Sequence, residues 1–225
     1  MQPRFVGRLG LADAVTVSNA MLGFFAAFVA TRDAGLAARI VLLAAVMDGL
    51  DGVIARKRGG TLAGPYLDSL ADVASFGVAP ALLVTSRAAD AWSWGADPLA
   101  LGLALLVPAV YVAMAVTRLG LYTAYDSDAA ETKGVPSTLA ATVLSAGVLA
   151  GFVGPALLVA LSGLLAGLMV TRITYPDLHP QDALVMGVVQ TLAILLRGRP
   201  GEAFAFALLF LALAYLFLGP RFYWT

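Results

Sequence analysis

Residues 48–72 read DGLDGVIARKRGGTLAGPYLDSLAD, and they lie between apolar runs that are typical of helices in a lipid bilayer. The stretch contains four carboxylates, those of Asp48, Asp51, Asp68 and Asp72, and it carries Arg56 between the two pairs. A charged side chain at the centre of a membrane helix costs about 2.5–3.5 kcal/mol on insertion scales, so such residues are retained where they have a function. The stretch therefore predicts a site that binds a cation together with an anionic ligand.

The composition independently indicates a membrane protein. Hydrophobic residues make up 60% of the chain and charged residues 12%, compared with ~25% charged residues in an average globular protein. The formal net charge is +0, which leaves no basic surface for a nucleic acid. The chain has no Cys and a single His, so thiol catalysis, iron–sulfur ligation and a histidine-rich zinc site are excluded. We expect that histidine, His179, to be a solvated loop residue or an interfacial residue.

Eight apolar segments follow one another along the chain, and most reach the ~17–25 residues that a membrane helix needs. They lie near residues 14–31, 37–56, 66–86, 99–122, 137–153, 155–172, 182–196 and 202–219. No strand-like alternation and no linker to a soluble domain stands out. We therefore expect an all-α integral membrane protein, a polytopic bundle of about eight spans that forms a single domain over residues 1–225.

The distribution of Lys and Arg predicts the orientation of this bundle. Cytoplasmic loops carry an excess of these residues. If the N-terminus is cytoplasmic, most Lys and Arg residues of the chain lie on the cytoplasmic side. That side holds Arg4, Arg8, Arg56, Lys57, Arg58, Arg118, Lys133, Arg172 and Arg221. We therefore expect a multi-pass protein of the cell membrane with both termini and the carboxylates toward the cytoplasm.

The spacing of the carboxylates favours a metal site. Asp48 and Asp51 are three residues apart and Asp68 and Asp72 four apart, so each pair shares one face of a helix. A short connection between the two helices would bring the pairs together. Oxygen ligands from facing helices suit hard cations such as Mg²⁺ or Mn²⁺, and we expect two divalent ions.

The residues around the carboxylates favour an anionic ligand beside the metal. Gly52, Ala55 and Gly64 are small, which allows a bulky ligand or a neighbouring backbone to approach closely. Arg56 follows Gly52 by one helical turn, where it could pair with a phosphate or with one of the aspartates.

The order DxxDGxxAR followed by GxxxDxxxD resembles the signature of the CDP-alcohol phosphatidyltransferases. The resemblance implies a six-helix catalytic core, here about residues 11–172, with extra spans at about 182–219, and it suggests a homodimer. It further implies a membrane enzyme that binds a CDP-linked lipid with divalent metal and transfers the phosphatidyl-type group to an alcohol, releasing CMP. The positions that carry the signature are Asp48, Asp51, Gly52, Ala55, Arg56, Gly64, Asp68 and Asp72.

The same resemblance implies roles for these residues. Asp48, Asp51 and Asp68 would hold metal and diphosphate, and Asp72 would lie at the metal centre and take the proton from the incoming hydroxyl. The set that would line the pocket for the cytidine diphosphate is Gly52, Ala55, Arg56 and Gly64.

Further segments resemble the serine-using branch of the family. The run LDSLADVASFGVAPA, residues 67–81, is similar to that branch, and Val73 stands where the glycerol-phosphate branch would carry Lys. Thr16 and Asn19 resemble the first span of the serine branch, where they would contact the CDP-lipid; helix–helix hydrogen bonding is an alternative role for both. The segment KGVPST, residues 133–138, is similar to a later motif of that branch. The motif has Pro at the position where this chain has Thr138.

The predicted acceptor is L-serine. Its carboxylate would meet Arg118 and Lys133 from the cytoplasmic side, although both could instead be ordinary cytoplasmic cations. Glycerol 3-phosphate or inositol phosphate is the alternative acceptor. As donor we favour CDP-archaeol over CDP-diacylglycerol, because residues 4–20 and 64–81 look most like archaeal members.

Two unrelated classes also place aspartates in membranes. A transporter could use them at an ion site, but it would not need the DGxxAR run. A membrane prenyltransferase also uses aspartate pairs with Mg²⁺, but its two motifs should lie far apart in sequence. Release of CMP would distinguish the predicted function from both, because a prenyltransferase releases diphosphate and a transporter produces an ion flux.

Overall fold

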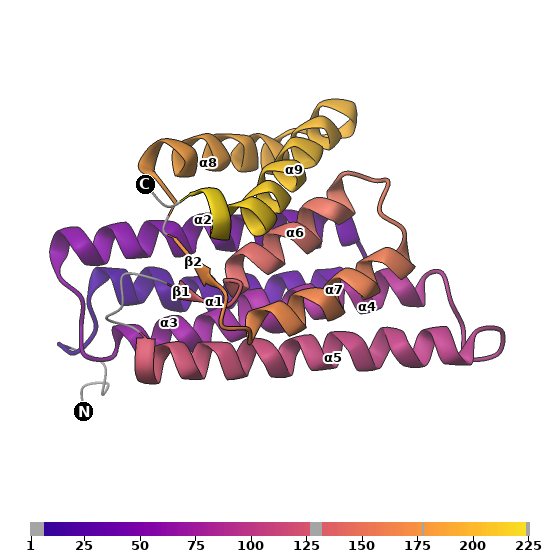
Figure 1. Ribbon diagram of the computed structural model, residues 1–225, viewed down its shortest axis with the longest axis horizontal. Helices are drawn as coiled ribbons and strands as arrows, with labels where there is room; N and C mark the ends of the chain where they lie inside the picture. The colour runs from indigo at the N-terminus through magenta and orange to yellow at the C-terminus, as the bar shows by residue number, and fades with distance from the viewer. Residues whose placement is uncertain (1–6, 127–131, 177, 224–225) are drawn as a thin grey trace.

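The computed structural model describes residues 7–126, 132–176 and 178–223, and these residues form a bundle of helices (Figure 1). The helices are α1 (Leu11–Ala30), α2 (Ala34–Arg58), α3 (Gly64–Asp72), α4 (Ala79–Ala89), α5 (Pro98–Leu121), α6 (Ser137–Leu149), α7 (Pro155–Met169), α8 (Pro180–Leu195) and α9 (Gly198–Phe222). Two π-helical segments, η1 (Val73–Val78) and η2 (Tyr122–Asp126), continue α3 and α5. Each apolar segment predicted from the sequence coincides with a helical element.

Local sequence explains where several helices begin and end. The Asp33 carboxylate caps α2 by accepting a hydrogen bond from the Leu36 N–H at 2.8 Å, which satisfies one of the free donors of the first turn. Gly59, at φ +85°, ends α2 in a conformation that favours glycine. Proline occupies the first turn of α5, α7 and α8, where its missing N–H has no helical partner to lose.

The helices α1, α2 and the continuous α3–η1–α4 rod pack together and carry the candidate site. Gly23 of α1 lies against η1 so closely that a Cβ atom at this position would come within 2.7 Å of the Ala74 carbonyl carbon. Only glycine allows this backbone-to-backbone approach. The helices α5, α6 and α7 complete the core around buried residues such as Tyr111 and Leu144.

The C-terminal helices α8 and α9 form a hairpin that lies over α2 and α6 (Figure 1). Arg39 of α2 fixes the end of α8, because its Nη1 donates to the carbonyls of Ala193, Ile194 and Leu196 at 2.6–2.7 Å. Gln190 of α8 donates in return to the Leu42 carbonyl of α2 at 2.7 Å. These bonds attach the hairpin firmly to the rest of the bundle.

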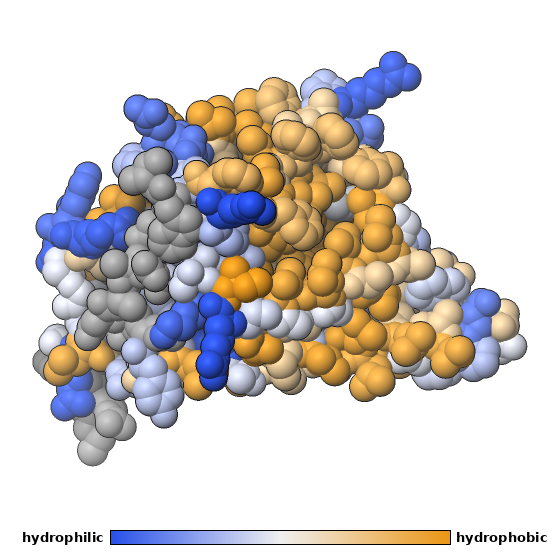
Figure 2. Space-filling model, viewed as in Figure 1, coloured by the Kyte–Doolittle hydropathy of each residue, from blue (hydrophilic) through white to orange (hydrophobic). Residues whose placement is uncertain are grey.

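The structure confirms the expected all-α membrane class. Among the residues that the structure describes, four helical stretches are long and apolar enough to cross a membrane: Leu11–Ala30, Gly64–Ala89, Pro98–Tyr125 and Gly198–Phe222. On the face shown in Figure 2, hydrophobic side chains cover the middle and hydrophilic ones gather mainly toward the ends. The 25-residue α2 carries Asp48 and Asp51, and α6, α7 and α8 have only 13–16 residues. The count of eight spans therefore stays a prediction.

One feature was not predicted from the sequence, a short antiparallel pair of strands. Thr132–Lys133 (β1) pairs with Thr174–Tyr175 (β2) and joins the segment before α6 to the segment before α8. Gly134 follows β1 at φ +73°, and a Cβ atom there would lie 2.1 Å from the Met169 carbonyl oxygen. A pair of two-residue strands is too short to produce a detectable alternation of hydrophobicity.

Candidate active site

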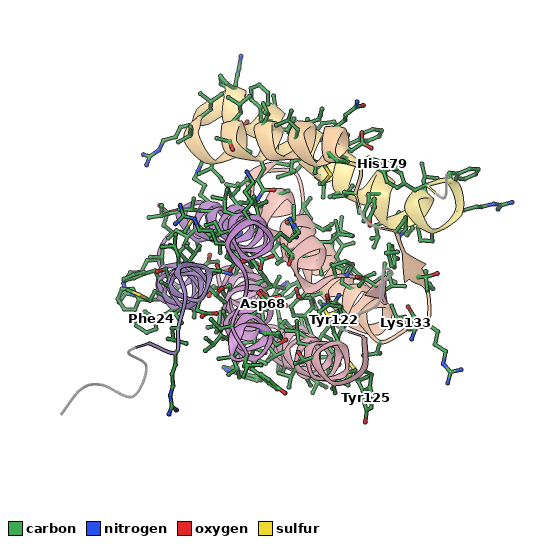
Figure 3. The ribbon with its side chains drawn as sticks, turned by 90° about the vertical axis from the view of Figure 1, so that its left-hand side faces the viewer. Phe24, Asp68, Tyr122, Tyr125, Lys133 and His179 are labelled. Atoms are coloured by element: carbon green, nitrogen blue, oxygen red, sulfur yellow. The ribbon has the colours of Figure 1, made fainter. Side chains whose placement is uncertain are left out.

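Three of the four predicted carboxylates meet in the structure. Asp48 comes from α2 and Asp68 and Asp72 come from α3, and each offers an oxygen within 4.8 Å of the others. Asp72 is buried and the other two are half-buried. Figure 3 looks along the bundle and shows Asp68 inside it, with Phe24 pointing away from it on the outer side of α1. Asp48 of the first pair and both members of the second pair therefore converge.

Asp51 lies outside this cluster, although it is buried one turn away from Asp48. Its Oδ2 accepts a hydrogen bond from the Thr16 hydroxyl of α1 at 2.6 Å. This bond is the helix–helix contact considered for Thr16, and Thr16 also lines the cavity described below. Direct metal ligation by Asp51 stays a prediction.

Two hydroxyl groups from the start of α6 reach the cluster. Ser137 Oγ donates to Asp72 at 3.4 Å, and Thr138 Oγ1 donates to Asp48 at 3.3 Å. The positive end of the α6 dipole points the same way. Sequence reasoning assigned neither residue to the site; the available signal was the Ser-Thr pair directly after Pro136, at the start of a helix.

A cavity of about 440 Å³ opens beside the carboxylates. Its walls come from α1, α2, α3, η2 and the segment between α2 and α3, and they include Thr16, Asp48, Asp51, Gly52, Ala55, Gly64 and Asp68. The structure thus brings most of the predicted CDP-lipid residues around one space. The small residues leave room there, since only Arg56 atoms would lie within 4 Å of a Cβ atom at Gly52.

Asp13 is a buried carboxylate in the cavity wall that sequence reasoning missed. Its Oδ2 accepts hydrogen bonds from the Gly10 N–H at 2.7 Å and the Thr61 hydroxyl at 2.9 Å. A Cβ atom at Gly64 would lie 3.4 Å from Oδ1 of Asp13. Asp13 thus ties the start of α1 to the segment before α3, and this tie sets the position of Gly64.

Arg56 lies at the end of α2 and is exposed. Its Nη1 would be 3.4 Å from a Cβ atom at Gly52, so the guanidinium group folds back toward the cavity wall. Within the described parts of the chain no ion pair joins Arg56 to an aspartate; the pair found there is Arg87 with Asp90. Pairing of Arg56 with a phosphate of the ligand stays a prediction.

The two predicted serine-binding cations differ in their surroundings. Arg118 is buried and interacts electrostatically with Asp72 and Asp48. Its guanidinium carbon lies 5.7 Å from the Tyr122 ring centre, and its Nε–H donates to none of the described residues. Lys133 is exposed on β1 and does not belong to the described lining of the cavity (Figure 3).

Asn19 and His179 lie apart from the cavity lining. Asn19 is buried, neither of its side-chain amide atoms has a hydrogen-bond partner among the described residues, and its backbone carbonyl accepts from Ser75 Oγ at 2.8 Å. His179 precedes α8, is exposed and stacks on Tyr223 with ring centres 4.7 Å apart. The expectation that His179 lies in a loop is therefore confirmed.

The donor set fits a hard divalent cation. Oxygen atoms from three carboxylates converge, and Oδ1 of Asp72 is buried without a hydrogen-bond donor among the described residues. In the described chain no Lys or Arg nitrogen comes within 4.0 Å of these carboxylates. Carboxylate oxygens gathered in this way are the ligands that Mg²⁺ and Mn²⁺ prefer.

The sequence pattern of one protein family, described as CDP-alcohol phosphatidyltransferase, matches residues 9–174. This range contains the carboxylate cluster and the cavity walls, and it ends before the α8–α9 hairpin. The chain belongs to this family. This CDP-alcohol phosphatidyltransferase is therefore an enzyme, as the signature predicted. The family match favours this function over the transporter and prenyltransferase alternatives.

Individual relatives extend this similarity. An archaetidylserine synthase of Methanothermobacter thermautotrophicus is 31% identical over 179 residues, which span 78% of this chain and 73% of the relative. A CDP-diacylglycerol–serine O-phosphatidyltransferase of Mycobacterium bovis is 32% identical over 120 residues, or 52% of this chain and 39% of the relative. A protein of the same name from Methanocaldococcus jannaschii is 39% identical over 75 residues, or 33% and 34%.

Proposed function

We propose that this CDP-alcohol phosphatidyltransferase transfers the phosphatidyl-type group of a CDP-lipid to the hydroxyl of L-serine. The observation that carries the proposal is the cluster of Asp48, Asp68 and Asp72 beside a cavity walled by the family's signature residues. The serine-using names of the relatives support the choice of acceptor.

Asp48, Asp68 and Asp72 would hold the divalent metal, and Asp51, which lines the same cavity, would complete a second site. Bound Mg²⁺ or Mn²⁺ supplies charge neutralisation for the diphosphate and for the charge that develops during transfer. Gly52, Ala55 and Gly64 leave space for the cytidine diphosphate, and Arg56, whose guanidinium group lies beside Gly52, would pair with a phosphate.

Asp72 is the proposed general base. It takes the proton from the serine hydroxyl as the serine oxygen forms a bond to the lipid-bearing phosphorus. The bond from that phosphorus to the bridging oxygen of the diphosphate breaks, and CMP leaves with the bonding electron pair. The hydrogen bond from Ser137, 3.4 Å from Asp72 Oδ2, keeps this carboxylate oriented.

Arg118 is the proposed partner of the serine carboxylate. It is a buried cation next to the base, and its free Nε–H lets the guanidinium group donate to a planar carboxylate. An acceptor that carries a phosphate would call for a denser cluster of cations. Lys133, on exposed β1, would act at the entrance rather than beside the base.

The donor and the cellular setting complete the proposal. We favour CDP-archaeol, because the archaetidylserine synthase matches 78% of this chain, whereas the two diacylglycerol enzymes match 52% and 33%. We place the protein in the cell membrane as a homodimer, with the cavity toward the cytoplasm, where serine is available and CMP can leave.

Incubation of the purified protein with a CDP-lipid, Mg²⁺ or Mn²⁺ and competing acceptors tests this function. CDP-archaeol and CDP-diacylglycerol are compared as donors, and L-serine, glycerol 3-phosphate and inositol phosphate as acceptors. We expect metal-dependent CMP release and a serine-containing lipid, with higher kcat/KM for CDP-archaeol. Faster use of a phosphorylated alcohol would reject serine as the acceptor, and a preference for CDP-diacylglycerol would reject the archaeol donor.

A further inference from the structure

A cavity of about 260 Å³ lies between α8 and α9, at the end of the hairpin where α8 begins and α9 ends. Most of its wall is apolar, and its polar side chains are those of Asp182, Tyr215 and Tyr223. The volume is below the ~300–1,000 Å³ of a pocket that encloses a whole small molecule, so the space suits a small headgroup. Both helices lie outside the family match, which ends at residue 174.

Two tyrosines form an aromatic corner in the wall of this cavity. The rings of Tyr215 and Tyr223 have centres 5.9 Å apart, and their planes meet at 89°. Both hydroxyls are anchored, because Tyr215 donates to the Pro176 carbonyl at 2.5 Å and Tyr223 donates to the Asp182 carboxylate. His179, at the start of α8, stacks on Tyr223 with ring centres 4.7 Å apart (Figure 3). Aromatic rings held at such angles are a known way to bind an ammonium ion, which is attracted to their faces.

The charges around the cavity favour a cation. Asp182 belongs to the wall, and in the described chain no Lys, Arg or His nitrogen lies within 4.0 Å of its carboxylate. The N-terminus of α8 contributes about half a positive charge and the C-terminus of α9 about half a negative charge, so the two helix dipoles roughly cancel. The described lining contains no Lys or Arg, and Arg221 is exposed outside it. The negative charge of Asp182 therefore remains to attract a cation.

The surroundings of the cavity indicate that a membrane lipid carries this cation. Helix α9 is long and apolar enough to cross a membrane, and Val185, Leu218 and Phe222 of the wall are more than half exposed. Those side chains would contact the hydrocarbon of a lipid beside the hairpin. A headgroup that also carries a carboxylate would find no cation in the described lining. A lipid whose headgroup has an ammonium group and no carboxylate therefore fits better than a serine lipid.

We propose that this cavity binds the headgroup of a membrane lipid that carries a primary ammonium group. The ammonium group donates a hydrogen bond to the Asp182 carboxylate and lies against the corner formed by Tyr215 and Tyr223, while the chains of the lipid stay in the bilayer. A bound headgroup contacts α8 and α9 together and so stabilises the open end of the hairpin. The site lies apart from the carboxylates of α2 and α3, and it does not depend on which donor and acceptor the enzyme uses.

Native mass spectrometry of the purified full chain tests the proposal on the wild-type protein. The protein in detergent is mixed with equal amounts of dioleoyl phosphatidylethanolamine, its N-acetyl derivative and dioleoyl phosphatidylglycerol. The N-acetyl derivative keeps the chains and the phosphate but lacks the positive charge. We expect phosphatidylethanolamine to be retained at least about tenfold more than the other two, the order that a hydrogen bond to a charged group contributes. Equal retention of the three lipids would overturn the proposal.

Two substitutions assign the retained lipid to this cavity. Asp182→Asn keeps the shape of the side chain and should abolish the preference for phosphatidylethanolamine, and Tyr223→Leu should lower it by about fivefold, as loss of a cation–π contact implies. The matched controls are Asp97→Asn, before α5, and Phe210→Leu, at an exposed position of α9; both residues lie outside the lining and should keep the preference. An unchanged preference in Asp182→Asn, or an equal loss in Asp97→Asn, would reject the site. If a variant fails to fold, the comparison of lipids on the wild-type protein decides.

Discussion

Replacing Asp68 by Asn tests whether the carboxylate cluster is held together against its own repulsion in order to bind metal. Asp48 and Asp72 accept hydrogen bonds from Thr138 and Ser137, and Asp68 accepts none of the side-chain hydrogen bonds found among the described residues. Asn has nearly the same shape as Asp and removes one negative charge. The substitution therefore changes electrostatics while breaking no hydrogen bond identified in the cluster.

The separation of the oxygens gives the size of the effect. Two full charges no more than 4.8 Å apart repel by at least about 3 kcal/mol at an effective dielectric constant near 20. Asp68 faces two such partners, and hydration and proton uptake reduce the sum, so we expect a net stabilisation of ~1–3 kcal/mol without metal. For a chain of this size, 1 kcal/mol corresponds to about 2–4 °C in melting temperature.

Thermal unfolding of the purified protein measures the repulsion between the carboxylates in EDTA and the stabilisation by bound metal in Mn²⁺. Asp68→Asn should melt at least ~2 °C above the wild type in EDTA. Mn²⁺ should raise the melting temperature of the wild type clearly and that of the variant little, and CMP release should be lost. Asp97→Asn is a suitable control, because the Asp97 side chain makes no capping bond to α5. A variant that melts lower in EDTA, or that keeps the full Mn²⁺ response and activity, would refute the reasoning.

Four further substitutions separate chemistry from architecture. Asp72→Asn should bind CDP-lipid and metal within about tenfold of the wild type while losing ~10²–10⁴ in kcat, as loss of a general base implies; calorimetry beside a turnover assay measures both. Arg118→Ala should raise the KM for serine more than the KM for CDP-lipid in steady-state assays. Tyr111→Phe removes the buried bond, 2.8 Å long, from the tyrosine hydroxyl to the Phe76 carbonyl in η1, and should lower stability in a denaturation assay by about 1–3 kcal/mol. Gly134→Ala should prevent correct folding, seen as loss of the monodisperse peak in size-exclusion chromatography, since its Cβ would lie 2.1 Å from a carbonyl oxygen.

Three of these predictions have a specific result that would contradict them. Loss of CDP-lipid binding as severe as the loss of rate would make Asp72 primarily a metal ligand. Lys133→Ala serves as the comparison for Arg118, and an equal effect of both on the serine KM would contradict the distinction drawn between a buried and an exposed cation. Gly167→Ala, at a glycine whose Cβ would meet no atom within 4 Å, should fold normally, and a well-folded Gly134→Ala protein would show that the tight turn tolerates a side chain.

Several features of the fold were predictable because their signals are local. Apolar runs of membrane length located the helices to within a few residues, and the three- and four-residue spacing of the aspartates placed each pair on one helical face. Helix ends were less accurate. The segment predicted to reach residue 153 stops at Leu149, because Gly151 takes up φ +78° and turns the chain.

The sequence alone determined the membrane class, the helices, the carboxylates and, through the spacing of its signature, the enzyme family. Hydrophobicity and helical periodicity depend on neighbours in the chain, so each can be recognised in a short window. Tertiary packing, by contrast, turns Asp51 toward Thr16, brings two hydroxyls at the start of α6 to the cluster, and attaches the C-terminal hairpin to α2. Those contacts join residues as far apart as 35, 65, 90 and 148 positions, and no local pattern specifies which distant helices will pack together.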